Sequence, residues 1–65
     1  MLTVGSMTGM DLRLLRVSKR VRVGQLARAM GVSHPRISQI ETLAVVNETT
    51  TLRYLEALRT LEVAA

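Results

Sequence analysis

The chain has 65 residues and no cysteine, so it allows one domain with a small core and excludes disulfides and cysteine-ligated zinc. The apolar residues are almost all aliphatic, and no apolar run approaches the roughly 20 residues that span a bilayer. Residues 1–10 lack the basic and long apolar regions of a signal peptide, and we therefore expect a cytoplasmic protein.

The positive charge is concentrated in one part of the chain. Residues 11–41 hold seven of the nine Lys and Arg residues but only two of the five acids, and the net charge of the chain is +4. This asymmetry is the electrostatic footprint of a polyanion-binding protein. A solvated basic face that keeps a small protein soluble gives the same composition, so charge alone leaves both interpretations open.

The first predicted element follows a short aperiodic segment. Residues 1–8 are expected to form a flexible N-terminal tail ahead of a domain at 9–65. Thr8 and Asp11 have the spacing of a capping box, and the residues after them continue at helical spacing. The pattern predicts a helix over residues 9–20.

A second helix is predicted over residues 23–30. Its inward face has the i, i+1, i+4 spacing of a short amphipathic helix and consists of Leu26, Ala27 and Met30. Gly31 suits the left-handed position just past a helix end. The predicted helix therefore stops at Met30.

A third helix is predicted from Ser33 to about Glu41 or Leu43. Ser33 is a good N-cap, and a proline in the first turn loses no hydrogen bond. Ile37 and Ile40 are expected to face inward.

A loop at 42–50 and a fourth helix complete the predicted fold. Thr49 or Thr50 is the predicted N-cap of this helix. Leucines recur in it every three residues, at Leu52, Leu55, Leu58 and Leu61. Residues 61–65 either extend this helix or form a short strand. The predicted fold is all-α, a small helix-turn-helix bundle of four to five short helices.

Three residues join the second and third helices, which is the helix-turn-helix pattern. With the two isoleucines turned inward, the residues of the third helix that point outward are His34, Pro35, Arg36, Ser38 and Gln39. Arginine pairs with guanine, glutamine with adenine and serine with either, and a helix fits the major groove of DNA. This face is therefore predicted to read base edges.

The segment QLARAMGVSHPRISQIE, together with LRLLR at 12–16 and TLRYLEAL at 51–58, resembles the lambda-type repressor and Cro family of helix-turn-helix proteins. The resemblance covers residues 12 to about 60. It implies that His34, Pro35 and Gln39 occupy the base-reading positions, that Arg36 and Ser38 flank them, and that Ser33 caps the helix. The predicted base-reading set comprises all six: Ser33, His34, Pro35, Arg36, Ser38 and Gln39. It further implies an ion pair between Arg16 and Glu41, which ties the first helix to the end of the third.

The resemblance also implies phosphate contacts beside the reading helix, and two departures change which residues supply them. The second helix begins at Arg22–Val23 where the family has a cap and a phosphate-binding glutamine, and the loop at 42–50 has no Lys or Arg. The predicted phosphate contacts are Lys19, Arg20, Arg22, Gln25 and Thr42. Of these, Gln25 stands two residues later than the glutamine of the family.

The predicted function is that of a sequence-specific double-stranded DNA-binding transcriptional regulator, similar to a phage Cro or repressor, that acts by operator occupancy. Useful specificity from one short helix usually requires a symmetric homodimer. The candidate dimer contacts are Tyr54, Leu58, Leu61 and Val63. The alternative is an antitoxin-type or other protein-binding module that also binds DNA, with a toxin or host protein as its partner.

An enzyme is not expected. The sequence contains no nucleophile–base pair at a suitable spacing, no carboxylate dyad and no cofactor loop, so no cofactor is predicted. His34 is the only histidine, and one histidine without cysteines does not complete a usual zinc site.

Overall fold

The computed structural model describes residues 7–64, and the side chains of residues 7–62. In this part of the chain there are four helices and no strand: α1 (Gly9–Ser18), α2 (Val23–Met30), α3 (His34–Glu41) and α4 (Glu48–Ala64). The predicted all-α fold is thereby confirmed, and residues 61–64 are helical. None of the described helices is both long and apolar enough to cross a membrane.

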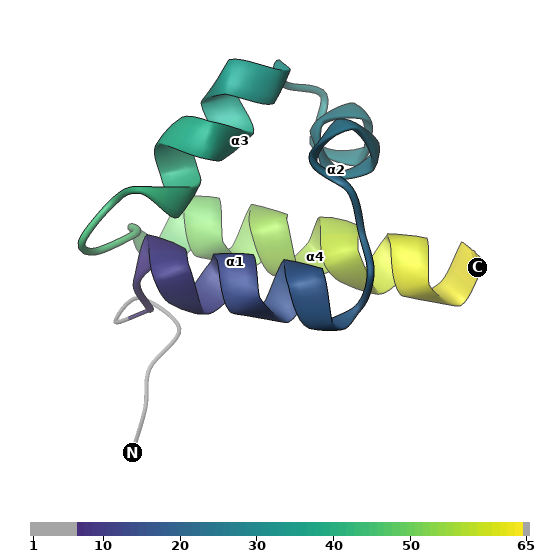
Figure 1. The fold of residues 1–65 in the computed structure, drawn as a ribbon, viewed down its shortest axis with the longest axis horizontal. Helices are drawn as coiled ribbons and strands as arrows, with labels where there is room; N and C mark the ends of the chain where they lie inside the picture. The colour runs from purple at the N-terminus through teal and green to yellow at the C-terminus, as the bar shows by residue number, and fades with distance from the viewer. Residues whose placement is uncertain (1–6, 65) are drawn as a thin grey trace.

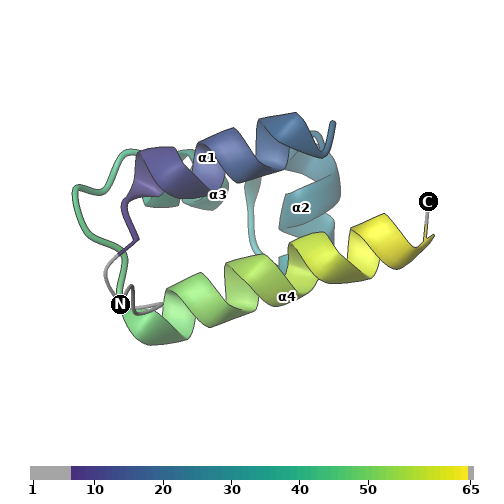
Figure 2. The ribbon, with the colours of Figure 1, turned by 90° about the horizontal axis from the view of Figure 1, so that it is seen from below.

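The four helices form two layers. Helices α1 and α4 lie side by side, and α2 and α3 cover them on one side (Figures 1 and 2). The core between the layers is aliphatic apart from one tyrosine, and its fully buried side chains include Leu12, Leu26, Ile37, Ile40, Val46, Tyr54 and Leu58. This packing leaves one side of α3 free on the outer layer.

Helix α1 begins as predicted and ends two residues early. The Thr8 hydroxyl accepts from the Asp11 N–H at 3.0 Å, and the Asp11 carboxylate accepts from the Thr8 N–H at 3.1 Å, which is the expected capping box. The helix stops at Ser18 because Arg20 adopts a left-handed backbone conformation with φ of 58°.

The structure ties the last two residues of the predicted tail to the domain. Met7 packs against the core, and its carbonyl accepts from the Val46 N–H at 3.0 Å. Thr8 caps α1. Residues 1–6, the rest of the predicted tail, lie outside the described residues.

Helix α1 approaches the end of α3 closely. The Gly9 N–H donates to the Leu43 carbonyl at 2.9 Å. A Cβ on Gly9 would clash with the carbonyl oxygen of Ile40 and would lie 2.6 Å from the carbonyl carbon of Glu41. Only glycine therefore permits this contact between the two helices.

The turn between α2 and α3 follows the local signals of the sequence. Gly31 has a φ of 71° and ends α2, while the Val32 N–H donates to the Ala27 carbonyl at 2.9 Å. The Ser33 hydroxyl caps α3 by accepting from the Arg36 N–H at 3.3 Å, and Pro35 lies in the first turn. The predicted bounds of α2, its glycine cap and the serine cap of α3 are all confirmed.

The start of α4 differs from the prediction, and its leucines do not share one face. Asn47, and not Thr49 or Thr50, supplies the cap, because its Oδ1 accepts from the Thr50 N–H at 2.8 Å. A step of three residues also rotates a helix position by about −60° relative to the previous one. Leucines at this spacing drift around the helix, so Leu58 is buried while Leu52 is 48% exposed.

Candidate nucleic-acid interface

Helix α3 presents a continuous polar face to solvent. Ile37 and Ile40 are 0% and 1% exposed, because positions three apart share one side of a helix and here pack on the core. The side chains between and before them are all exposed: Ser33, His34, Pro35, Arg36, Ser38 and Gln39. The structure therefore brings the whole predicted base-reading set together on one accessible surface.

Two members of this set contact each other. Arg36 Nη1 donates to Gln39 Oε1 at 2.9 Å, at the i, i+3 spacing of neighbours on a helix. The remaining guanidinium donors of Arg36 and the amide NH₂ of Gln39 can still reach outward. This contact orders the two side chains that are best suited to bind purine edges.

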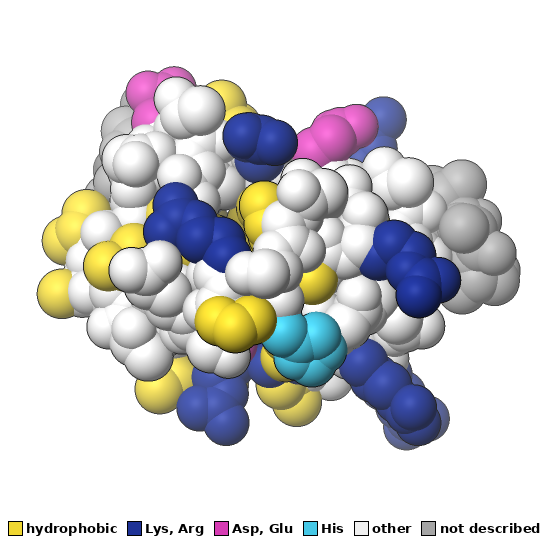
Figure 3. Space-filling view, turned by 90° about the horizontal axis from the view of Figure 1, so that it is seen from above, with side chains coloured by type: hydrophobic (Ala, Val, Ile, Leu, Met, Phe, Trp, Pro, Cys, Tyr) yellow, Lys and Arg dark blue, Asp and Glu magenta, His cyan; other side chains and the backbone are white. Residues whose placement is uncertain are grey.

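Cationic side chains surround the exposed face of α3. In the view onto this side of the molecule, Lys and Arg side chains are spread across the surface, and acidic side chains gather along one edge (Figure 3). Arg22, the N-cap of α2, and Arg28 of α2 line a surface cavity together with His34 of α3. The electrostatic field at the reading helix therefore favours a polyanion.

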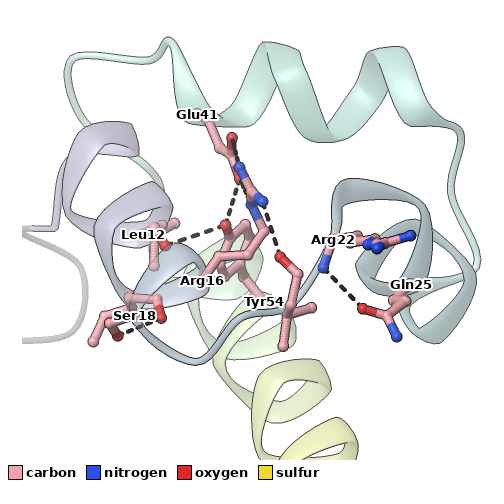
Figure 4. Close-up of polar contacts among 9 residues, drawn as sticks. Leu12, Arg16, Ser18, Arg22, Gln25, Glu41 and Tyr54 are labelled. Carbon is pink, nitrogen blue, oxygen red and sulfur yellow. Dashed lines mark hydrogen bonds and ion pairs between the residues drawn. The ribbon is translucent and has the colours of Figure 1, made fainter.

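The predicted phosphate contacts divide into two groups. Arg22 and Gln25 lie at the start of α2, where the Arg22 N–H donates to Gln25 Oε1 at 2.9 Å (Figure 4). Thr42 directly follows α3, and its hydroxyl donates to the Gln39 carbonyl at 2.8 Å. These three residues adjoin the reading helix.

The other two predicted phosphate contacts lie elsewhere. Lys19 and Arg20 follow the C-terminal end of α1, which is at the bottom of the molecule when α3 is at the top (Figure 1). The Lys19 Nζ is 2.9 Å from Glu62 Oε2 of α4, in an exposed ion pair. The structure thus gives Lys19 a partner within the protein.

A buried polar cluster holds α3 in place. Arg16 Nε donates to Glu41 Oε2 at 2.7 Å and Nη2 donates to Oε1 at 3.1 Å, so the ion pair that the family resemblance implies is present and bidentate (Figure 4). Arg16 Nη1 donates to the Val21 carbonyl at 3.0 Å. The Tyr54 hydroxyl donates to Glu41 Oε2 at 2.6 Å and lies 3.2 Å from the Leu12 carbonyl oxygen. The cluster joins α1, α3 and α4.

The cluster changes the ionisation of its members. Burial raises the pKa of Glu41, but the hydrogen bonds from Arg16 and Tyr54 outweigh burial and hold that pKa below its ordinary value. The hydrogen bond to Glu41 raises the pKa of Arg16 against the opposing effect of burial. Burial, together with the hydrogen bond to Glu41, raises the pKa of Tyr54 well above its ordinary value. Glu41 is therefore ionised and Tyr54 neutral at physiological pH.

Two of the four predicted dimer contacts are buried in the core of the protomer. Tyr54 is 0% exposed and Leu58 is 1% exposed, because both lie on the buried face of α4, four residues apart. Leu61 is partly buried against the core. The side chain of Val63 lies outside the described ones.

Sequence reasoning missed three participants in these surfaces. Tyr54 bonds a residue of α3 across the core. Glu62 pairs with Lys19 across 43 positions of the sequence. Arg28, to which the sequence assigned no role, lines the same cavity as His34. Arg28 lies four residues after Gly24 and so on the same side of α2, which is the one local feature that relates it to this cavity.

These features define a class of protein. A short helix pair with a glycine turn, a polar outer face on its second helix and cationic neighbours is a helix-turn-helix unit of the DNA-binding kind. Residues 9–65 match the family model described as a helix-turn-helix domain, and the chain belongs to this family. Membership indicates DNA binding, and domains of this family are typically not enzymes. Comparison with curated proteins and with solved structures found no match.

Proposed function

We propose that the protein is a sequence-specific double-stranded DNA-binding regulator of the repressor or Cro type, a binding protein without catalytic activity that acts by occupying its operator. The observation that carries this proposal is the outer face of α3. Six polar or small side chains are exposed there, while the buried side of the same helix is held by Ile37, Ile40 and the ion pair of Glu41. A helix so anchored can enter the major groove without rearrangement.

One recognition helix of eight residues contacts few base pairs. We therefore propose that two copies bind a palindromic site, with their α3 helices about 34 Å apart, which is one turn of DNA. Repression then requires only that the pair stands where polymerase or another regulator binds.

Selection of bound fragments from genomic DNA, followed by binding measurements over a salt series, tests this proposal. We expect one preferred, palindromic sequence bound by two protomers, and a preference that persists at moderate salt. Arg36→Gln should reduce the preference, whereas Arg59→Gln, a matched loss of an exposed arginine on α4, should preserve it. Binding without any sequence preference would contradict the regulator function.

One observation favours a second candidate, a protein-binding module of the antitoxin type that also binds DNA. Met10, Leu14 and Val17 are 52%, 60% and 54% exposed, and their spacing places them on one side of α1. A stable complex with the product of an adjacent gene, lost in Leu14→Glu while DNA binding persists, would support this candidate. Loss of DNA binding in the same variant would instead indicate damage to the fold.

A further inference from the structure

The imidazole of His34 is turned toward α2. A Cβ on Gly24 would lie 3.0 Å from His34 Nε2 and 3.7 Å from His34 Cδ2. The absence of a side chain at Gly24 is therefore what leaves room for the ring against the first turn of α2. This places His34 differently from Arg36 and Gln39, which bond each other along the outer face of α3.

His34 and Gly24 belong to the wall of a cationic cavity. The cavity has a volume of about 830 Å³, and its lining includes Arg22, the N-cap of α2, and Arg28 of α2. The described residues that line it include no acid. Glu62, which follows a lining leucine, is engaged by Lys19. Beside an apolar part of the lining that includes Val23 and Leu61, the two arginines, Gln25 and His34 are side chains that can donate hydrogen bonds to an oxyanion.

The position of this cavity relative to α3 indicates which oxyanion it binds. In a helix-turn-helix protein the first helix of the pair crosses the sugar–phosphate backbone while the second lies in the groove. A side chain that leaves α3 toward α2 is therefore directed at the edge of the groove, where the backbone runs.

We propose that His34, together with Arg22 and Arg28, binds a backbone phosphate of the operator and does not read a base, and that Gly24 is the positioning residue that makes this possible. The proposal rests on the DNA-binding function proposed above. It removes His34 from the base-reading set and leaves the polar readout to Arg36, Ser38 and Gln39. His34 then sets the register of α3 along the duplex, because phosphate contacts position a protein and base contacts specify the sequence.

The test uses the selected operator with one phosphate at a time replaced by a neutral methylphosphonate. At one phosphate the wild-type protein should lose affinity by about tenfold, as expected for a charge-assisted hydrogen bond. His34→Ala should lose less affinity than the wild type at that phosphate, because its own contact is already absent and only those of the two arginines remain. The same variant should weaken binding to the operator and to its single-base-pair variants by an equal factor, so that the base preference is unchanged.

Two substitutions at Gly24 test the positioning role. Gly24→Leu fills the space of the ring and should reduce the loss of affinity at the same phosphate to the value found for His34→Ala. Gly24→Ala is the matched control, because the flexible tip of His34 has to move by only a few tenths of an ångström, and the loss of affinity at that phosphate should match that of the wild type. Circular dichroism and thermal unfolding check that both variants fold, and alanine should raise the melting temperature because it favours helix.

Three results would overturn the proposal. His34→Ala could change the preferred base at one operator position while losing as much affinity as the wild type at every neutralised phosphate, which would show that His34 reads a base. The variant could bind every duplex as tightly as the wild type. Finally, a folded Gly24→Leu protein could lose as much affinity as the wild type when that phosphate is neutralised, which would exclude a positioning role for Gly24.

Failure of the regulator function gives a different result. The wild-type protein would then bind DNA without sequence preference. The phosphate contact would still be measured, as a loss of affinity for nonspecific duplex in His34→Ala that is absent in Arg59→Gln. If His34→Ala bound nonspecific duplex as tightly as the wild type, the phosphate contact would be overturned as well.

Discussion

The two sides of α3 do different work although they belong to one helix of eight residues. On the inner side Ile37 and Ile40 are buried, and Glu41 bonds side chains from α1 and α4. On the outer side the side chains of Arg36 and Gln39 are exposed and contact only each other among the described hydrogen bonds. The residues of the inner side determine where the helix lies, and those of the outer side are available to contact a ligand.

This division has an energetic reason. A buried carboxylate is tolerated only while its partners are present, so any change around Glu41 affects folding. An exposed polar side chain exchanges protein contacts for water at little net cost, so a change there affects folding very little. Substitutions on the inner side should therefore alter stability, and those on the outer side should alter DNA binding alone.

The largest effect is expected when Glu41 loses its guanidinium partner. Arg16→Met leaves the carboxylate, whose side chain is 8% exposed, without its bidentate ion pair. We expect the free energy of unfolding to fall by about 3–5 kcal/mol, measured by urea denaturation. Arg13→Met, an exposed neighbour on the same helix, should change it by less than about 0.5 kcal/mol. Similar small effects of both substitutions would show that the cluster does not anchor α3.

A smaller loss is expected at the contact between α1 and α3. The Cβ of Gly9→Ala meets backbone atoms of Ile40 and Glu41, which cannot move unless α3 shifts. We expect a destabilisation of about 1–3 kcal/mol in thermal or urea unfolding. Gly24→Ala is the control for the helix propensity of alanine, because its Cβ meets only the tip of His34 and should be neutral or stabilising. Equal effects at both glycines would argue against the close approach.

The cluster also predicts how stability depends on pH. The folded pKa of Glu41 is below its ordinary value of 4.5, so its contribution is complete above that pH and is lost as the pH falls further. The folded pKa of Tyr54 is above its ordinary value of 10.0, so its contribution is present below pH 10 and is lost as the pH rises beyond it.

Melting temperatures measured across pH should therefore form a plateau between these limits. The acidic decline should shrink in Glu41→Gln and the alkaline decline in Tyr54→Phe. A decline that survives both substitutions would have another origin.

On the outer side, stability and binding should separate. Arg36→Ala and Gln39→Ala should each change the free energy of unfolding by less than about 0.5 kcal/mol. Each should also reduce discrimination at one base pair by about 1–3 kcal/mol, measured by competition between operator variants. If these variants lost stability but kept their discrimination between base pairs, the outer side of α3 would serve folding and not DNA recognition.

The smallest effect is expected at the exposed ion pair of Lys19 and Glu62. Lys19→Gln should lower the free energy of unfolding by no more than about 1 kcal/mol. Because Lys19 is paired within the protein, we also expect the salt dependence of DNA binding to be unchanged. A decrease of about one in the salt slope would show instead that Lys19 contacts a phosphate, as predicted from the sequence.

Much of the fold could be predicted because its signals are local. The capping box of Thr8 and Asp11, the left-handed Gly31 and the cap at Ser33 each involve residues within one or two turns. The exposure of the candidate reading face follows from the same cause, since burying Ile37 and Ile40 determines which positions of one helix point outward.

Contacts between distant segments could not be predicted in this way. The sequence proposes Tyr54 as a dimer contact, and nothing local to it indicates that this side of α4 faces the core. The leucines of α4 recur every three residues, and at this spacing their side chains spread over half of the circumference of the helix. Leu52 is therefore exposed while Leu58 is buried. The cap at Asn47 was not predicted, although asparagine is a better N-cap than threonine, because Thr49 and Thr50 follow within three residues and also suit a helix start.

The sequence by itself determined the helices, the turn and the polar outer face of α3, because helix periodicity and capping depend on neighbouring residues alone. Only the tertiary structure decided that Glu41 is held from two other helices and that His34 lies over Gly24 beside two arginines. The physical reason is that these contacts depend on how helices cross, and that geometry is set by the packing of the whole core.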